Sequence, residues 1–453
     1  MLNIVINSKK VTPGVTFIPI VGEVHDGHKF IPDAVSSGAK KVYYSSTDPT
    51  LDQFISGQPD VEWVKVQDTT QLLGELAAAH IDEMKRLHGL KVVAITGSVG
   101  KTTTKDILGQ LLSHFGETVF PKESFNNEIG VPLTVFAVND TTEYLVLEIG
   151  ANHIGEIESL TQIAQPDVAV LLKAGVAHEG EFGGEDVIVK EKAKIFASSP
   201  VLGIIQADDA NSETLFNLAR GMSAATRFEG LSAKNAENIV LDEFERLSFD
   251  FKGQHFCTNF SGRHQIYNVL AALQVMLSGV LLDKVEDIAT LAPIIAKISP
   301  IAEHRMQVKQ FASGVAIIDD AYNANPDSMR AAVDALLNMS RRDGKKSVAV
   351  LGDMLELGEN SAKLHAEVGL YAIEQGVDEI WTIGEEAEHY ADLLDAKQRA
   401  RVRNYNEAVR NPEKLCTLTA PNVTANSENK NVVYLLKASS SLKLWEKVEE
   451  LKR

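Results

Sequence analysis

The chain has 453 residues, of which 44% are hydrophobic and 23% charged, a balance typical of soluble globular proteins. This length predicts several domains of roughly 100–200 residues each, and we expect three. A formal net charge of −18 excludes a broad basic face for nucleic acid or an anionic membrane. No apolar stretch reaches the roughly 20 residues needed to span a bilayer, so a cytoplasmic protein is predicted.

The first part of the chain, residues 1–88, mixes short apolar strands with turn-rich polar segments. It ends in a helical pattern from Thr70 to Leu87, in which Leu73, Leu76 and Ile81 share one apolar face. We therefore expect a small α/β N-terminal domain that a helix joins to the next domain.

The central part, residues 89–300, begins with a buried-type strand at Val92–Ile95 that runs into glycines and then into a helix. Similar strands follow at Tyr144–Leu147 and Val168–Leu172, separated by helix-length segments. This alternation predicts a mainly parallel sheet with helices on its faces.

In residues 301–453, new strands recur between helical patterns. The expected strands are Val315–Ile318, Val348–Leu351, Ile380–Ile383 and Val432–Leu436, and the helical patterns run from Ser328 to Met339 and from Ala362 to Glu374. They predict a second doubly wound sheet appended to the first. The predicted fold class is therefore α/β with three domains.

A glycine-rich loop follows the first central strand and reads Thr96-Gly97-Ser98-Val99-Gly100-Lys101-Thr102-Thr103. Only two residues separate Gly97 from Gly100, a shorter spacing than in the common P-loop. Glycines let the backbone approach phosphates, Lys101 supplies a positive charge, and Thr102 or Thr103 can reach Mg²⁺ or phosphate. The loop predicts binding of ATP and Mg²⁺, the alternative being a turn that needs glycine only for its shape.

Two side chains are expected beside this loop, because each follows a parallel strand at the carboxyl edge of the sheet. Glu148 closes the strand Tyr144–Leu147, and a carboxylate there suits Mg²⁺. His178 follows the next strand and is a candidate second metal contact, although a lone histidine is more often an ordinary surface or core residue.

Two asparagine-rich segments are candidate binding loops. One spans residues 124–130 and contains Asn126 and Asn127, and the other spans residues 319–326 and contains Tyr322, Asn323 and Asn325. Because asparagine and aspartate also mark ordinary turns, the residues alone leave both readings open.

Six motifs together resemble the Mur ligases, the ATP-dependent amide ligases that assemble the peptide stem of bacterial peptidoglycan. The motifs are Thr96–Lys105, Asn126–Thr134, Glu148–His153, Gly262–His264 with Tyr267–Asn268, Asp319–Met329 and Leu351–Gly358. They run in the family's order over nearly the whole chain. The asparagine loops resemble the branch of the family that adds D-alanyl-D-alanine.

The resemblance implies a UDP-substrate domain over 1–88, an ATPase domain of P-loop type over 89–300 and a Rossmann-like ligase domain over 301–453. It implies that ATP and two Mg²⁺ ions drive the joining of D-alanyl-D-alanine to UDP-N-acetylmuramoyl-tripeptide through an acyl phosphate, in the synthesis of a peptidoglycan precursor. We expect a monomer that binds neither nucleic acid nor membrane.

The resemblance also implies roles for single residues. Lys101 and Thr102 would hold phosphates and magnesium, with Glu148 and His178 as further magnesium ligands. The other implied contacts are Asn268, Arg305 and Asp320 to the nucleotide, Asn126, Asn127, Tyr322, Asn323 and Asn325 to substrate, and Ser8 to uridine.

Lys192 aligns with a lysine that the Mur ligases carbamylate. Addition of CO₂ to its neutral amine would create a carboxylate-like group able to support a second magnesium ion. The alternative is a solvated helix face, on which Lys190 and Lys194 are close neighbours.

The chain departs from the family pattern at three places. The N-terminal segment is short and reads Asn7-Ser8-Lys9 in place of Asp-Ser-Arg, Lys173–Val176 replaces Asn-Ile-Gly-Pro, and Lys437-Ala438-Ser439-Ser440 replaces Lys-Gly-Ser-Arg. These changes keep two alternatives open: a related ligase with another amine or carboxylate substrate, and a non-catalytic nucleotide-binding protein.

Overall fold

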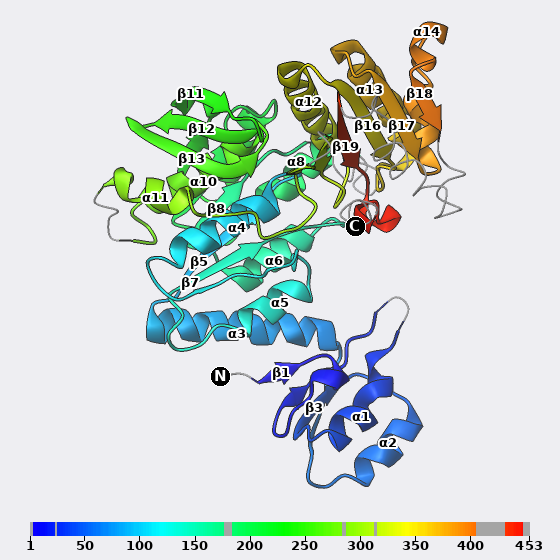
Figure 1. The fold of residues 1–453 in the computed structure, drawn as a ribbon. Coiled ribbons are helices and arrows are strands. Elements are labelled where there is room, and N and C mark those ends of the chain that lie inside the picture. Colours follow the sequence, from blue (N-terminus) through cyan, green and yellow to red (C-terminus); the bar gives the residue numbers. More distant parts are fainter. Residues whose placement is uncertain are drawn as a thin grey trace.

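The computed structural model describes residues 3–22, 25–175, 184–282, 287–311, 315–404 and 431–446. Figure 1 shows an N-terminal unit below a central unit, and a C-terminal unit beside the central one. The predicted α/β class with three domains is confirmed. None of the described helices is both long and apolar enough to cross a membrane.

The N-terminal unit is built on a parallel sheet of four short strands in the order β1-β2-β3-β4. The strands are β1 Ile4–Val5, β2 Thr16–Phe17, β3 Lys41–Tyr44 and β4 Glu62–Lys65, with helices α1 Ile31–Ser36 and α2 Pro49–Ser56 and 3₁₀ turns η1 Ser8–Lys10 and η2 Gly27–Phe30. Its small core includes Phe17, Ile31 and Val42, all fully buried or nearly so.

Helix α3 Thr69–His88 connects the N-terminal and central units. The Asp68 side chain accepts hydrogen bonds from the backbone at its start, and Gly89 ends it in a left-handed conformation. Its buried face, which includes Leu73 and Ile81, joins the hydrophobic core of the central sheet. The domain boundary at residue 88 stays a prediction. Although α3 precedes that boundary, its buried side chains pack in the core of the central unit.

The central unit holds a six-stranded parallel sheet in the order β10-β9-β8-β5-β7-β6. Its strands are β5 Lys91–Thr96, β6 Thr118–Val119, β7 Tyr144–Glu148, β8 Val168–Leu171, β9 Leu202–Gln206 and β10 Arg227–Leu231. Its helices are α4 Lys101–Leu112, α5 Gly130–Val135, α6 Glu156–Ala164, α8 Glu185–Ala193, α9 Ser212–Met222, α10 Gln265–Leu277 and α11 Ala292–Ile295, with 3₁₀ turns η3 Lys194–Phe196, η4 Ala233–Asn235 and η5 Ile288–Thr290.

Both faces of the central sheet are buried, because side chains alternate along each strand. In β5, Val93 and Ile95 pack with α4 and α10, whereas Val92 and Ala94 pack with α3, α5 and α6. Strand β5 lies between β8 and β7, so the loop that follows it emerges at the middle of the sheet edge. This is where open α/β sheets bind ligands.

A three-stranded antiparallel sheet, absent from the predicted elements, is inserted before α10. Its strands are β11 Ala236–Leu241, β12 Arg246–Phe251 and β13 Gln254–Ser261. Phe249, Phe256 and Phe260 cover the side of the core that contains α10.

The C-terminal unit is a six-stranded sheet in the order β14-β15-β19-β16-β17-β18, in which only β14 runs antiparallel to its neighbour. The strands are β14 Gln307–Gln310, β15 Ala316–Asp319, β16 Lys346–Gly352, β17 Glu379–Ile383, β18 Val402–Asn404 and β19 Val432–Lys437. The helices are α12 Pro326–Asp343, α13 Ser361–Gln375 and α14 Ala396–Arg399, with 3₁₀ turns η6 Gly358–Asn360, η7 Glu386–Ala391 and η9 Ser440–Leu442.

Arg342, in the last turn of α12, ties the C-terminal unit to the antiparallel sheet of the central unit. Its guanidinium donates to the carbonyls of Asp242 and Glu243, each at 2.6 Å, and to Glu245 Oε1 at 3.1 Å. The Glu245 side chain is only 2% exposed, and burial raises its pKa while Arg342 lowers it. The contact therefore supplies a cation to a buried carboxylate that Asn338 also hydrogen-bonds.

Replacing Arg342 by methionine is expected to lower the free energy of unfolding by about 1–3 kcal/mol, because the buried Glu245 loses its cationic partner. Thermal unfolding and limited proteolysis between the two units would measure this. Arg341→Met is the matched control, since Arg341 donates to the Gln375 carbonyl within the C-terminal unit. Equal proteolysis of the two variants would contradict a role for Arg342 in holding the units together.

Candidate active site

A cleft of about 970 Å³ lies where the central and C-terminal units face each other. The glycine-rich loop, Glu148 and Lys192 line it from the central unit, and Asp320 and Asn323 line it from the C-terminal unit. Segments that lie far apart in the sequence therefore meet at one place.

The glycine-rich loop has a backbone that only glycine adopts easily, with φ of +153° at Gly97 and +86° at Gly100. Ser98 fixes the loop to the segment after β8, because its N–H donates to the Lys173 carbonyl and its hydroxyl to the Gly175 carbonyl, each at 2.7 Å. Helix α4 begins directly after Gly100. Its amino end lines the cleft, an arrangement that favours an anionic ligand.

Replacing Gly100 by alanine is expected to destabilise the protein by about 1–3 kcal/mol and to weaken ATP binding. A Cβ atom there would lie 2.4 Å from Asn268 Oδ1, in a backbone conformation that alanine disfavours. Gly89→Ala is the control, because Gly89 also has a positive φ but no atom within 4 Å of the added carbon. Calorimetry should show weaker ATP binding for Gly100→Ala alone, and unchanged binding would contradict this account.

Lys101 and Arg305 place positive charge beside the loop. Lys101 Nζ donates to the Gly97 carbonyl at 2.8 Å. Burial lowers the pKa of Lys101, Glu148 opposes this shift, and Arg305 lowers the pKa further. Lys101 and Arg305 repel each other electrostatically, and a bound polyanion such as a triphosphate would relieve this repulsion.

Glu148 is a buried carboxylate with one oxygen available to a cation. Its Oε1 accepts from Asn126 Nδ2 at 2.8 Å, whereas its buried Oε2 has no hydrogen-bond partner among the described residues. Within that part of the chain no three His, Cys, Asp or Glu side chains gather into a metal site. A metal here would need phosphate and water oxygens as further ligands, which fits Mg²⁺.

Lys192 is buried in α8 and lines the same cleft. Burial, and after it the charge of Lys101, lower its pKa to about 7, with Glu191 opposing the shift. A large fraction of this amine is therefore neutral at physiological pH and able to act as a nucleophile. Lys190 is exposed on the same helix and does not line the cleft.

Ser124 contacts both Thr102, at the start of α4, and Arg305, which precedes the first strand of the C-terminal unit. Its hydroxyl lies 3.2 Å from Thr102 Oγ1 and accepts from Arg305 Nη2 at 3.4 Å. The guanidinium of Arg305 lies 4.2 Å from the ring centre of Tyr322, a cation–π contact. Arg305 is thus held over the cleft by groups from both units.

Asn268 and Asp320 are fixed by short polar contacts. Asn268 accepts from Thr104 Oγ1 at 3.2 Å and donates to Gln265 Oε1 at 2.6 Å. Asp320 accepts from the N–H of Met306 at 3.0 Å and from Lys437 Nζ at 2.6 Å. Both side chains line the cleft on which the loop opens.

Models of three families match successive parts of the chain. They are the Mur ligase family catalytic domain over residues 2–81, the Mur ligase middle domain over 95–276 and the Mur ligase glutamate ligase domain over 304–426. The UDP-N-acetylmuramoyl-tripeptide–D-alanyl-D-alanine ligase of Mycobacterium tuberculosis is 34% identical over 404 residues, covering 83% of this chain and 76% of the relative. The chain belongs to the Mur ligase family.

Other members of the Mur ligase family match over nearly the full length. The Bacillus subtilis ligase of the same name is 32% identical over 451 residues, which cover 98% of this chain and 92% of that protein. The solved structure of MurF from Acinetobacter baumannii matches with a TM-score of 0.82 and 28% identity, covering 99% of this chain and 92% of that one. MurF from Thermotoga maritima, solved in complex with ADP, gives 0.77 and 27%, with 99% and 96% coverage.

Most residues implied by the resemblance to Mur ligases line the cleft. They are Ser98, Val99, Gly100, Lys101, Thr102, Thr103, Asn126, Glu148, Lys192, Asn268, Arg305, Asp320, Tyr322, Asn323 and Asn325. Thr96 is buried and donates to the Ile149 carbonyl, so it supports the loop from behind.

Besides Thr96, three implied residues do not line the cleft, and a further one cannot be placed. Asn127 accepts from the N–H of Gly130 at 2.9 Å, whereas Ser124 and Asn126 line the cleft from the same loop. Gly97 lies in the loop beneath the lining residues, and Ser8 lies in η1 of the N-terminal unit. His178 lies outside the described residues.

Two cleft contacts were not predicted as parts of the Mur ligase site. Lys173 Nζ forms an ion pair with Asp327 Oδ1 at 2.7 Å, which joins the segment after β8 to the first turn of α12. Lys437 Nζ also donates to the Asn323 carbonyl at 2.9 Å. Both lysines lie in segments that depart from the family pattern. This departure was the feature of the sequence that could have indicated the two contacts.

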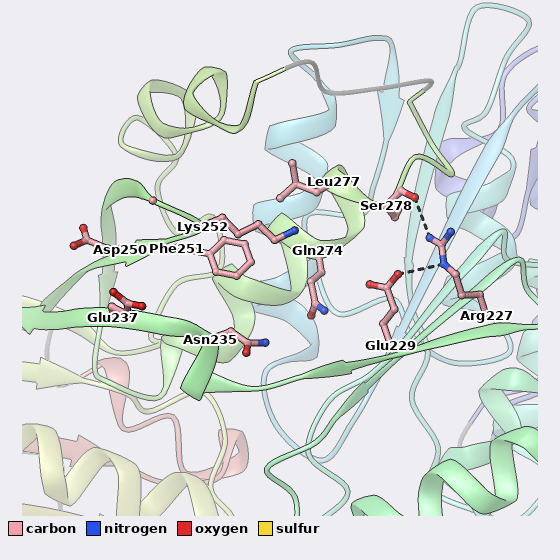
Figure 2. Close-up of a pocket in the computed structure, with 11 residues that line it drawn as sticks. Arg227, Glu229, Asn235, Glu237, Asp250, Phe251, Lys252, Gln274, Leu277 and Ser278 are labelled. Atoms are coloured by element: carbon pink, nitrogen blue, oxygen red, sulfur yellow. Dashed lines mark hydrogen bonds and ion pairs between the residues drawn. The ribbon is translucent and has the colours of Figure 1, made fainter.

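A second pocket of about 740 Å³ lies between β10, the antiparallel sheet and α10. Figure 2 shows Arg227 there beside Glu229 and Ser278, to which it is joined at 3.2 and 2.9 Å. It contains none of the six Mur ligase motifs, and its acidic Asp250 already accepts from Asn238 and His255. The chemistry is therefore assigned to the cleft.

Proposed function

We propose that this Mur ligase uses ATP to join D-alanyl-D-alanine to UDP-N-acetylmuramoyl-tripeptide in the synthesis of a peptidoglycan precursor. Two relatives that are named for that activity match this chain over most of their length. The observation that carries the proposal is one cleft in which Lys101, Arg305 and Glu148 meet the asparagine-rich loops.

A carboxylate resists attack by an amine because oxide is a poor leaving group. In the proposed reaction the tripeptide carboxylate attacks the γ-phosphorus of ATP, and an acyl phosphate forms. Lys101 and Arg305 stabilise the negative charge that is spread over the transferred phosphoryl group. The amine then displaces phosphate from the acyl carbon.

Thr102 and Glu148 would hold Mg²⁺, with His178 as a third proposed ligand. When bound, the ion neutralises charge on the phosphate oxygens. The buried Oε2 of Glu148 supports this assignment, because an uncompensated carboxylate oxygen is costly.

Lys192 is proposed as the site of carbamylation and as the support of a second magnesium ion. The neutral fraction of its amine is the form that adds CO₂, which supports this proposal. The carbamate would turn a buried cation into an anion beside Lys101, whose charge then stabilises it.

Asn268 and Asp320 are proposed to contact the nucleotide, and Asn126, Asn323 and Tyr322 the substrates. Asn325 caps α12, since its side chain accepts from the N–H of Ser328 at 2.9 Å, so its role would be to hold that loop in place. We further propose that residues 1–88 bind the UDP end of the acceptor, with Ser8 near uridine, and that the enzyme is a cytoplasmic monomer.

An omission assay tests the proposal. The protein is incubated with ATP, Mg²⁺, UDP-N-acetylmuramoyl-tripeptide and D-alanyl-D-alanine, and each component is then left out in turn. The expected result is ADP release that needs both substrates, with a product heavier by the dipeptide minus water. ADP release that is unaffected by either substrate would contradict the proposal.

A related ligase with another amine is the second candidate. Ala438 and Ser440 replace the glycine and arginine of the family pattern, and Ser440 lines the cleft. A serine cannot supply the positive charge that an arginine would offer to a carboxylate. Activity with other amines and none with D-alanyl-D-alanine would favour this candidate.

A further inference from the structure

Arg305 lies between two residues with unusual backbone conformations. The φ angle is +59° at His304 and +52° at Met306, in the left-handed region that residues other than glycine rarely adopt. Such conformations persist only where the surrounding structure holds them in place. The contacts of His304 and Met306 therefore determine where the side chain of Arg305 enters the cleft.

Met306 is held by the end of strand β19. Its N–H donates to Asp320 Oδ1 at 3.0 Å, and Asp320 Oδ2 accepts from Lys437 Nζ at 2.6 Å. Lys437 is the last residue of β19, and its side chain is only 1% exposed. The chain then continues into the cleft wall at Ser439 and Ser440.

His304 is held by its backbone and by both sides of its ring. Its carbonyl accepts from the N–H of Tyr322 at 3.1 Å, and its Nδ1 donates to Oδ2 of the fully buried Asp319 at 2.9 Å. The imidazole stacks on the indole of Trp445, with ring centres 5.4 Å apart and planes at 21°. The ring therefore has a fixed position between the sheet and the C-terminal end of the described chain.

Both neighbours of Arg305 are thus held by one stretch of chain, residues 437–445. Lys437 reaches Met306 through Asp320, and Trp445 contacts His304 directly. We call residues 437–445 the positioning segment.

The guanidinium end of Arg305 has weaker contacts than its neighbours. Its Nη2 donates to Ser124 Oγ at 3.4 Å, longer than the roughly 2.7–3.2 Å of a typical hydrogen bond. Its Nε is buried and has no hydrogen-bond partner within the described ranges, and the remaining contact is the face of the Tyr322 ring. The position of the guanidinium therefore depends strongly on the backbone from which it extends.

We propose that the positioning segment sets Arg305 for the phosphates of ATP, with Trp445 and His304 as positioning residues. This role rests on the nucleotide contact proposed above for Arg305. A guanidinium is planar and binds phosphate through paired N–H groups in a fixed geometry. A small displacement of its backbone therefore removes much of the interaction.

The affinity for nucleotide reports the position of Arg305 without any need for ligation. Calorimetric titration with Mg²⁺ and adenylyl imidodiphosphate, a non-hydrolysable ATP analogue, compares wild type, Trp445→Leu, Arg305→Met and the double variant. Arg305→Met is expected to weaken binding about 10-fold or more, and Trp445→Leu about 5-fold or more. The double variant should bind within about twofold of Arg305→Met, because Trp445 acts through the guanidinium that is missing.

Two further variants separate positioning from stability. Trp445→Phe keeps an aromatic ring against His304 and should bind the analogue within about threefold of wild type. Leu442→Ala is the matched control in the positioning segment, because Leu442 packs against Gly352, where an added Cβ would lie 2.8 Å from Leu442 Cδ1. It should lower the temperature of unfolding and keep the nucleotide affinity of wild type.

His304→Gly replaces Trp445→Leu in the cycle if the latter does not fold. Glycine adopts the φ of +59° without strain, and the stacked ring is lost. This variant should also weaken binding of the analogue, and it should have no further effect in the Arg305→Met background.

Each other outcome overturns the inference. Additive losses in the double variant would show that Trp445 affects nucleotide affinity without Arg305. Unchanged affinity in Trp445→Leu, or a loss that persists in Trp445→Phe, would exclude the stacked ring as a positioning contact. Unchanged affinity in Arg305→Met would overturn the nucleotide contact as well. Wild-type protein that does not ligate the dipeptide, with the binding cycle as expected, would contradict the proposed function alone.

Discussion

Replacing Lys101 by methionine is expected to reduce ATP turnover by about 100- to 1,000-fold. The ammonium group and the guanidinium of Arg305 place positive charge beside the glycine-rich loop, and the ammonium group is fixed there by the Gly97 carbonyl. Removing a fixed donor to a developing negative charge costs this much in comparable sites. ADP release under saturating substrates measures the effect.

Methionine keeps the length of the side chain, so the fold should be retained. Lys122→Met is the control, because Lys122 is exposed nearby and does not line the cleft. It should keep the turnover of wild type. A Lys101→Met enzyme within about threefold of wild type would refute the assignment of the loop to the phosphates.

Replacing Lys192 by methionine is expected to reduce ligation by about 100-fold or more, because the proposed carbamate and the metal that it supports are lost. Lys190→Met is the matched control on the same helix and should keep normal activity. Carbon-13 NMR with labelled bicarbonate should show a carbamate signal that is present in Lys190→Met and absent from Lys192→Met. Full activity of Lys192→Met would contradict the role.

The same substitution also has an expected effect on stability in bicarbonate-free buffer. The pKa of Lys192 falls from 10.5 to about 7 on folding, so between these values the unfolded chain binds more protons than the folded one. Stability contributed by this group therefore rises with pH from about 7 to about 10. Lys192→Met should be more stable than wild type near pH 7, and this advantage should shrink towards pH 10 in thermal unfolding.

Much of the fold could be predicted because its strands are short continuous apolar runs. The run Val92–Ile95 predicted β5, and the pattern Thr70–Leu87 predicted α3 to within one residue at each end. Such runs are typical of parallel strands that are buried on both faces. The packing of α3 on the central sheet was not predictable, because an apolar helix face does not identify its partner.

The antiparallel sheet β11–β13 was missed although it left a signal. Leu247, Phe249 and Phe251 alternate with polar residues, and Lys252 and Gly253 both have positive φ in the turn that follows. This is the pattern of a hairpin with one solvent-facing side.

The residues of the site that belong to motifs could be predicted, but the polar contacts between the units could not. Lys101 and Glu148 were found because their residue types and positions after strands have chemical meaning, whereas Asp320 was identified through the resemblance to Mur ligases. The Lys173–Asp327 pair and the clasp of Arg342 on the β11–β12 turn join residues from different units. Their partners depend on how the units meet, which a single sequence does not contain.

Transfer of oxygen-18 from substrate to phosphate tests the central claim most directly. UDP-N-acetylmuramoyl-tripeptide is labelled in the reacting carboxylate and incubated with ATP, Mg²⁺, D-alanyl-D-alanine and the enzyme. If the carboxylate is activated as an acyl phosphate, the released inorganic phosphate carries one labelled oxygen for each amide formed. Phosphate that carries no label, or takes its oxygen from solvent water, would contradict activation of the carboxylate by this protein.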